Sequence, residues 1–329
     1  MSWFSFSKPK EGVEVVRPGE QPQDHPVLVD PMWLLKAGVL AVLGAAVCGY
    51  IALCLLFYQG QWQLVLHPAP MQEVPASALP PHQDVRFAMT ESGKATLFGW
   101  WVPADKSAMW EAYTLVYVTS GGGSMSDATA RITYLHQLRA NVFVFDYRGY
   151  GNSAKLHPSQ ESMNADAVSA LRYLTDTRHI PPSHIVMAAD GLGALPALHA
   201  ANQTPGVAAV ILDNPRMSQR AVFLADPRTA ILPMKLLLRD EFSLDGEIQA
   251  FKAPKLILDS LGTQQGAADA REVYDHATEP KKFLDTPAIS GSGALSAQVA
   301  QFLANTLSAD SVNPAAPENG STPAPHPGK

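Results

Sequence analysis

The sequence predicts an α/β domain on the C-terminal side of one membrane helix. Between residues 62 and 308, near-continuous apolar strand candidates alternate with helical segments, which is typical of a mainly parallel sheet with helices on both faces. An uncharged apolar run near the N-terminus predicts the membrane helix.

Composition limits the function classes. The 329 residues are enough for one large domain. The net charge of −6 argues against nucleic-acid binding, which needs a basic surface. The two cysteines, Cys48 and Cys54, both fall inside the apolar run, so the remaining chain has none and needs no disulfides.

The run Ala37–Tyr58 holds 22 residues without a charge. About 20 apolar residues in a helix span a bilayer core, so we place a membrane helix at residues 34–58. A cleaved signal peptide is the rival interpretation, but its apolar region would be about 7–15 residues behind a short leader. Here a leader of more than thirty residues precedes the run.

Basic residues predict the orientation of this helix. Lysines and arginines precede or open the run at positions 8, 10, 17 and 36, and none follows until Arg86. The positive-inside rule then places the N-terminus in the cytoplasm and the domain outside it.

Small residues recur every fourth position along the predicted helix, at Ala37, Ala41, Ala45 and Gly49. Such a stripe lets two membrane helices approach closely. It is compatible with a homodimer, although small residues are common in any membrane helix.

The two ends of the chain lack core-forming residues. Residues 1–33 are a polar, Pro-rich leader, and residues 309–329 are a tail of Pro, Ala, Gly and Ser. We expect both to be disordered, with the folded domain confined to residues 62–308.

Within the domain, β-branched and apolar runs predict strands at 85–89, 96–102, 114–119, 141–145, 185–188, 208–212, 256–259 and 282–284. The first two are too close for a crossover helix and should be antiparallel. Helical spacing predicts helices at 127–139, 166–174, from Leu192, near 267–277 and at 293–307, with a mixed helical stretch at 217–250.

The string Asp146-Tyr147-Arg148-Gly149-Tyr150-Gly151-Asn152-Ser153 follows the predicted strand 141–145. This string resembles the DYRGYGxS motif of membrane-anchored serine hydrolases in the α/β-hydrolase superfamily. Leu-Val-Leu-His-Pro at 64–68, Asp-Ala at 166–167, Leu-Asp-Asn-Pro at 212–215 and the stretch 236–242 extend the resemblance. It implies an α/β-hydrolase fold with a small helical cap.

The resemblance also implies where a nucleophile should lie, in a G-x-S-x-G elbow between a strand and a helix. The matching segment is Ala189-Asp190-Gly191-Leu192-Gly193, so the serine position holds Gly191. Glycine has no side chain and cannot attack a carbonyl. A slip of one residue would offer Asp190 as a nucleophile, but Leu192 would then stand where a small residue is needed.

The other triad positions are also unfilled by this comparison. The acid position falls at about Thr263, and the loop 285–293, where the histidine should lie, contains none. Weak candidates are Asp213 after the sixth strand and His157 beyond the motif, on the expected active-site edge. Either one is more often a plain structural or solvated residue.

The loop after the third predicted strand reads Ser120-Gly121-Gly122-Gly123-Ser124. Its backbone N–H groups could form an oxyanion or anion nest together with Gly191 and Leu192. A P-loop is excluded, because no Gly-Lys-Ser/Thr follows.

Three missing triad residues within otherwise intact strings indicate lost chemistry, since removing triad members costs about 10⁴-fold or more in rate. We therefore expect a catalytically inactive, membrane-anchored binding or scaffolding module. The alternatives are a hydrolase of an ester, thioester or amide that uses Asp190, Asp213, His157, Ser120 or Ser260, and a structural membrane protein that assembles through its anchor. No metal-ligand spacing or dinucleotide motif appears, so we expect no metal and no cofactor.

Overall fold

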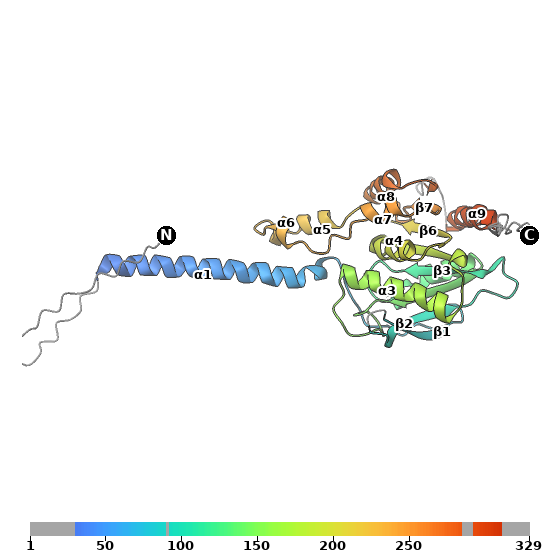
Figure 1. Ribbon diagram of the computed structural model, residues 1–329, viewed down its shortest axis with the longest axis horizontal. Helices are drawn as coiled ribbons and strands as arrows, with labels where there is room; N and C mark the ends of the chain where they lie inside the picture. Colours follow the sequence, from blue (N-terminus) through green and yellow to red (C-terminus); the bar gives the residue numbers. More distant parts are fainter. Residues whose placement is uncertain (1–29, 90–91, 285–291, 311–329) are drawn as a thin grey trace, which may run out of the picture. The chain divides into compact units, whose positions relative to one another are not determined.

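The computed structural model describes residues 30–89, 92–284 and 292–310 (Figure 1). The leader and the tail predicted to be disordered lie almost wholly outside these ranges. The chain divides into two units, one up to Leu53 and one from Cys54 on, and each is described by itself.

The first unit contributes most of a long helix, α1 (Pro31–Gly60). Its 30 residues exceed the predicted 34–58 by three residues at the start and two at the end. No side chain along α1 is buried in the protein, and the helix is long and apolar enough to cross a membrane.

The second unit is built on one eight-stranded sheet with the order β1-β2-β4-β3-β5-β6-β7-β8. The strands are β1 (Gln83–Ala88), β2 (Ala95–Val102), β3 (Trp110–Val118), β4 (Ala140–Asp146), β5 (Ile185–Asp190), β6 (Ala209–Asp213), β7 (Lys255–Leu258) and β8 (Lys281–Leu284). The predicted antiparallel pairing of the first two is confirmed; β2 also pairs antiparallel with β4, and every later pairing is parallel. Apolar runs explain this arrangement, because the central strands are buried on both faces.

Helices cover the sheet on both faces, as predicted. One core contains buried residues of α3 (Gln160–Arg172), α4 (Ala194–Gln203), α7 (Asp245–Ala250) and α8 (Gln264–His276). The other contains buried residues of α2 (Thr129–Gln137) and α9 (Ser292–Asp310). Short helical turns complete the unit: η1 (Gln61–Leu64), η2 (Met125–Ala128), η3 (Tyr173–Thr177), η4 (Pro182–His184) and η5 (Gly191–Gly193).

A small cap lies between β6 and β7, within the mixed helical stretch predicted at 217–250. It consists of α5 (Arg220–Ala225), η6 (Pro227–Thr229) and α6 (Met234–Leu237), and it projects away from the sheet (Figure 1). Phe223, Leu232 and Met234 form its own small apolar cluster.

Candidate functional site

The turn from β5 into α4 has the backbone of a sharp strand-to-helix elbow. Gly191 follows the last residue of β5 with a φ of +52°, a left-handed conformation that side chains rarely adopt. A Cβ at Gly193 would lie 2.5 Å from the carbonyl oxygens of both Val118 and Thr119. Glycine at 193 is therefore required for α4 to pack this closely against the end of β3.

The elbow has room for a side chain at position 191 but carries none. A Cβ there would meet only the Cβ of Ser120, at 3.4 Å, which is ordinary van der Waals contact. The structure thus brings Ser120 beside Gly191, as expected for two residues of one site. The Leu192 side chain is buried in the core.

The glycine loop after β3 is held in place by hydrogen bonds. His67, in the segment that enters the domain, donates its N–H to the Gly121 carbonyl (3.0 Å) and accepts from the Gly123 N–H (2.9 Å). The Tyr150 hydroxyl donates to the same Gly121 carbonyl (2.8 Å). Gly122 lies between these bonds, so the backbone of a potential anion nest is fixed before any ligand arrives.

The segment 146–153, which we call the tyrosine loop, supplies much of this support. Tyr147 donates to the Thr119 carbonyl (3.2 Å), and the Ser153 hydroxyl donates to the Asp146 carbonyl (2.6 Å) while accepting from the Phe98 N–H (2.9 Å). The Asp146 carboxylate accepts from the Met125 N–H (2.7 Å). The motif that carries the family resemblance thus acts here in packing and positioning.

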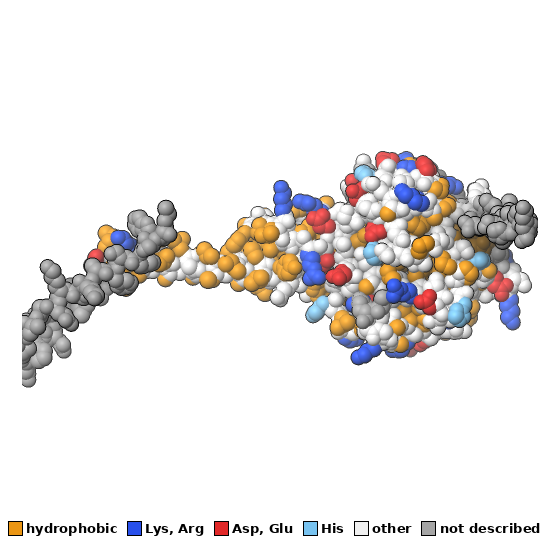
Figure 2. All heavy atoms as spheres, in the orientation of Figure 1, with side chains coloured by type: hydrophobic (Ala, Val, Ile, Leu, Met, Phe, Trp, Pro, Cys, Tyr) orange, Lys and Arg blue, Asp and Glu red, His pale blue; other side chains and the backbone are white. Residues whose placement is uncertain are grey.

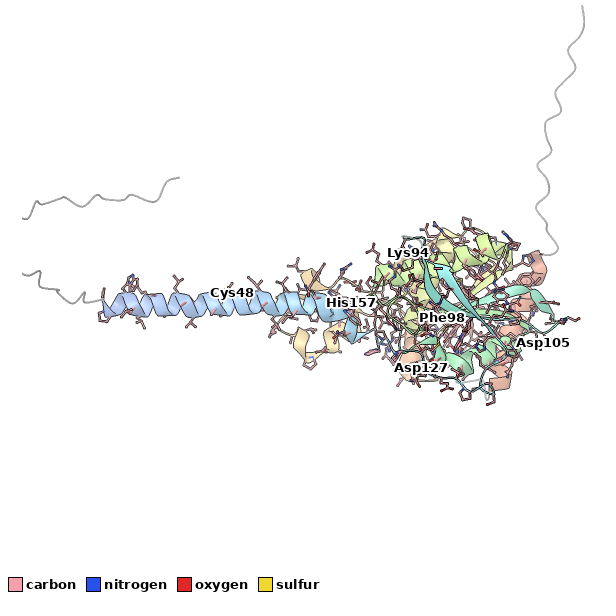
Figure 3. All side chains as sticks on the ribbon, turned by 90° about the horizontal axis from the view of Figure 1, so that it is seen from below. Cys48, Lys94, Phe98, Asp105, Asp127 and His157 are labelled. Carbon is pink, nitrogen blue, oxygen red and sulfur yellow. The ribbon has the colours of Figure 1, made fainter. Side chains whose placement is uncertain are left out.

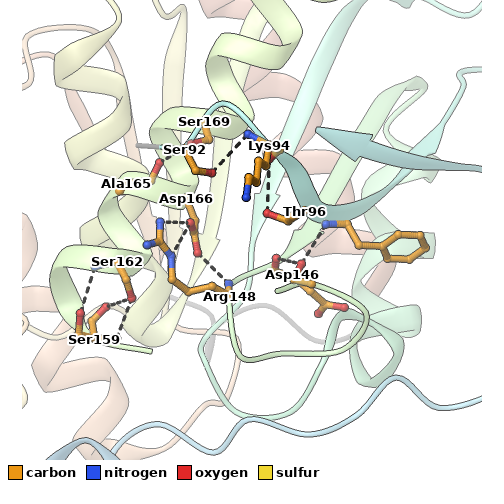
Figure 4. A network of polar contacts seen from close by, with 12 residues as sticks. Ser92, Lys94, Thr96, Asp146, Arg148, Ser159, Ser162, Ala165, Asp166 and Ser169 are labelled. Carbon is orange, nitrogen blue, oxygen red and sulfur yellow. Dashed lines mark hydrogen bonds and ion pairs between the residues drawn. The ribbon is translucent and has the colours of Figure 1, made fainter. Parts of the chain in front are cut away.

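An ion pair locks the tyrosine loop to α3 (Figure 4). The Asp166 side chain is fully buried and accepts from three nitrogens of Arg148: the backbone N (2.7 Å), Nε (2.9 Å) and Nη2 (2.6 Å). Both guanidinium nitrogens donate to Oδ1, and the backbone N–H donates to Oδ2, so charge-assisted bonds hold both carboxylate oxygens.

Polar side chains gather at the carboxyl ends of β5, β6 and β7, a region that we call the elbow edge (residues 190–193, 213–214 and 259–260). Asp190 and Asp213 end their strands opposite each other in register. Arg131, from α2, pairs with Asp213 at 2.5 Å and donates to the Ser260 hydroxyl at 3.0 Å. The Asn214 amide donates to Asp190 at 3.1 Å.

The two partners of the elbow-edge ion pair differ in the balance between burial and neighbouring charges: the charge on Arg131 is favoured, whereas the charge on Asp213 is disfavoured. Burial alone would lower the pKa of the Arg131 guanidinium, but the carboxylates of Asp213 and Asp190 outweigh burial and raise it. Burial raises the pKa of Asp213, and Arg131 only partly offsets this. Burial also raises the pKa of the neighbouring Tyr117 phenol, which therefore stays protonated at neutral pH. The Asp213 carboxylate is thus engaged by the Arg131 guanidinium.

A cavity of about 20 Å³ opens beside these groups, lined by residues that include Tyr117, Arg131, Asp190 and Asp213. A volume of this size admits about one water molecule. Within the described ranges, no group of three or more His, Cys, Asp or Glu side chains could hold a metal ion.

The remaining predicted site residues lie elsewhere or outside the described ranges. The His157 ring contacts Trp62, with ring centroids 5.6 Å apart, and lines a separate hollow with Arg239 and Asp240; Figure 3 places it at the opposite end of the domain from Asp105. Thr263 caps the start of α8 by accepting from the Gly266 N–H (3.0 Å). Of the histidine-free loop 285–293, residues 285–291 lie outside the described residues.

The sequence analysis missed Arg131. The signal was present, because Arg131 falls on the same helical stripe as Leu135 and Leu138, at spacings of four and seven. A charged residue on a buried stripe requires a partner, and the two strand-end aspartates provide it.

Several known proteins are similar to this chain in sequence. An uncharacterised protein of Mycobacterium tuberculosis, Rv2307c, is 29% identical over 254 residues, which cover 76% of this chain and 86% of that protein. The uncharacterised protein YfhR of Salmonella typhimurium is 28% identical over 222 residues, covering 63% of this chain and 74% of YfhR. The α/β hydrolase domain-containing protein WAV2 of Arabidopsis thaliana is 34% identical over 103 residues, covering 31% of this chain and 33% of WAV2. No protein-family model matches the chain.

Among solved structures, the esterase Pf2001 of Pyrococcus furiosus superimposes with a TM-score of 0.55 at 16% identity, covering 74% of this chain and 98% of the esterase. An esterase domain from Rhodothermus marinus gives a TM-score of 0.50 at 15% identity, covering 69% of this chain and all (100%) of that domain. The chain therefore has the fold of the α/β hydrolases, with esterases among its structural neighbours. At these identities the likeness to the esterases shows the fold alone.

Proposed function

We propose that this protein is a membrane-anchored α/β-hydrolase-fold module that binds or scaffolds and does not hydrolyse by a serine mechanism. One observation carries the proposal: the elbow keeps the backbone of a nucleophile turn, but residue 191 has no side chain and the nearby Asp213 is paired with Arg131. Under this proposal, Gly191 occupies the serine position and Thr263 the acid position. The preformed glycine loop remains available to hold a carboxylate or carbonyl oxygen.

Turnover assays test the proposal directly. The purified full-length chain in detergent is incubated with short-chain p-nitrophenyl esters and acyl thioesters, beside a heat-inactivated sample. We expect equal rates in both samples, because neither an activated nucleophile nor a base meets the substrate. Rates well above the inactivated sample would contradict the proposal.

One observation favours a second candidate, a hydrolase with a relocated nucleophile. Ser120 presents its side chain to the space above Gly191. Under this alternative, Ser120 attacks the carbonyl and an aspartate such as Asp190 accepts the proton. Turnover that survives Gly191→Ala and is lost in Ser120→Ala would support it.

The anchoring part of the proposal rests on α1. Its length, its apolar side chains and the lysine asymmetry support a membrane span with the N-terminus in the cytoplasm and the domain outside. Protease added to intact cells or spheroplasts should then degrade the domain and leave a short N-terminal stub. If the domain is protected from protease until the cells are lysed, the orientation is the opposite of the proposed one.

The small-residue stripe Ala37, Ala41, Ala45 and Gly49 further leads us to propose a homodimer through the anchor. Crosslinking in membranes should yield a dimer that Ala41→Leu with Ala45→Leu reduces, whereas Val42→Leu with Val47→Leu does not. Equal crosslinking in both variants would exclude this stripe as the contact.

A further inference from the structure

The cap exposes large apolar side chains on its outer surface. Leu224 is 52%, Ile231 65% and Leu236 81% exposed, and Figure 2 shows hydrophobic side chains gathered over this part of the molecule. Single exposed apolar residues are ordinary. Here three of them, Leu224, Ile231 and Leu236, occur within one short cap.

The inner side of the same cap packs on the end of α1. Phe223, Leu232 and Met234 form a buried cluster, against which Cys54, Phe57, Leu64 and Val65 pack. Buried and exposed apolar residues alternate closely along the cap, as in Phe223 and Leu224 or Ile231 and Leu232. Among the described residues, the cap therefore has buried apolar side chains that pack on protein and other apolar side chains that are exposed.

The contact with α1 fixes the depth of the cap. The apolar run ends at Tyr58, and Cys54 lies four residues earlier, about 6 Å deeper along a helix. Apolar faces of interfacial helices bury about 5–10 Å into a bilayer. A cap that packs on Cys54 and Phe57 thus lies at the depth of such an interfacial element.

Charged residues flank the apolar surface in a manner that suits this depth. Lys235 is exposed beside Leu236, and the Arg239 side chain, which follows α6 and lies 3.9 Å from the Glu161 carboxylate, is 52% exposed. Long basic side chains can lay their stems along an apolar surface while the charged group reaches the phosphates of lipid headgroups.

We propose that Leu224, Ile231 and Leu236 insert into the interfacial layer of the bilayer that α1 spans. This inference rests on the proposed anchoring and goes further, because it adds a second membrane contact made by the domain itself.

Lipid-borne quenchers test the inference on the full-length chain in nanodiscs of phosphatidylcholine and phosphatidylglycerol. Single cysteines, Leu236→Cys and Ile231→Cys, are introduced with Cys48→Ser and Cys54→Ala and are labelled with an environment-sensitive fluorophore. Nitroxide lipids should quench both labels by about twofold or more, as for side chains within an interfacial layer. Met109→Cys, which replaces a 71% exposed residue outside the cap, is the matched control and should be unaffected.

A chain that keeps only Cys48 reports the anchor. Quenching at Cys48 without quenching at positions 231 and 236 would overturn the inference about the cap, while still supporting the proposed membrane anchoring. An unquenched Cys48 would overturn the proposed anchoring and, with it, this inference. Labels at 231 and 236 that are shielded from both nitroxide lipid and aqueous iodide would assign a protein partner to the cap and also overturn the inference.

Discussion

The tyrosine loop and the elbow edge lie at the same end of the sheet, yet they differ in how firmly the surrounding fold holds their polar groups. In the tyrosine loop, Tyr147, Tyr150 and Ser153 bond to backbone carbonyls, and Arg148 is held by the fully buried Asp166. At the elbow edge, the Arg131 side chain is 26% exposed, and a small cavity opens beside its ion pair. The string at 146–153 therefore has a structural role in this fold that does not depend on chemistry at the elbow edge.

The largest test of this difference compares the two arginines. Arg148→Ala removes the guanidinium group that pairs with the buried Asp166 carboxylate, which should cost about 3–5 kcal/mol of unfolding free energy. Arg131→Ala should cost about 1–2 kcal/mol, since Asp213 can take up a proton and water can enter the cavity. Urea unfolding of the full-length chain in detergent measures both. Equal losses of unfolding free energy in the two variants would show that the fold holds the two arginines equally firmly.

A second test separates the two glycines of the elbow. Gly193→Ala places a Cβ against two backbone carbonyls, so we expect a loss of about 3 kcal/mol. Gly191→Ala meets only ordinary contact and should lose about 1–2 kcal/mol, the cost of a left-handed backbone. The same urea experiment ranks them. A reversed order would mean that the α4–β3 packing relaxes more easily than the turn.

A third test uses pH. Burial raises the pKa of Asp146 from 3.8 to about 6. A raised carboxyl pKa means that the folded chain binds the proton more tightly, so this contribution to stability is complete below about pH 4 and is lost as the pH rises through 6. Relative to Asp146→Asn, the natural chain should lose at most about 3 kcal/mol between these pH values. If the unfolding free energies of the two proteins change with pH in parallel, the pKa of Asp146 lies near its ordinary value.

The fold was largely predictable because its signals are local. Runs such as residues 141–145 and 208–212 are apolar enough to require burial on both faces of a sheet, and helical spacing located α2, α3 and α8. The cap was predicted only as a mixed helical stretch, because its short helices pack on the end of α1 and hold little periodicity of their own.

The site was predictable in part. Gly191 lies at the turn between β5 and α4 with Ser120 beside it, a place that a strand-to-helix sequence pattern indicates. The pairing of Arg131 with Asp213 depends on a contact across 82 residues of sequence, which no local pattern encodes. The position of His157 against Trp62 likewise depends on how the entry segment folds back onto the domain.

The most direct test of the central claim is labelling with a fluorophosphonate, which reacts with activated serine nucleophiles. The full-length natural chain and Gly191→Ser are treated in parallel with an active serine hydrolase, and labelled peptides are mapped. We expect no label on either protein above a heat-inactivated sample, because Gly191→Ser restores a hydroxyl in a turn that still lacks a histidine base. Labelling of the natural chain, mapped to Ser120, Ser260 or any other serine, would contradict the account and identify the nucleophile.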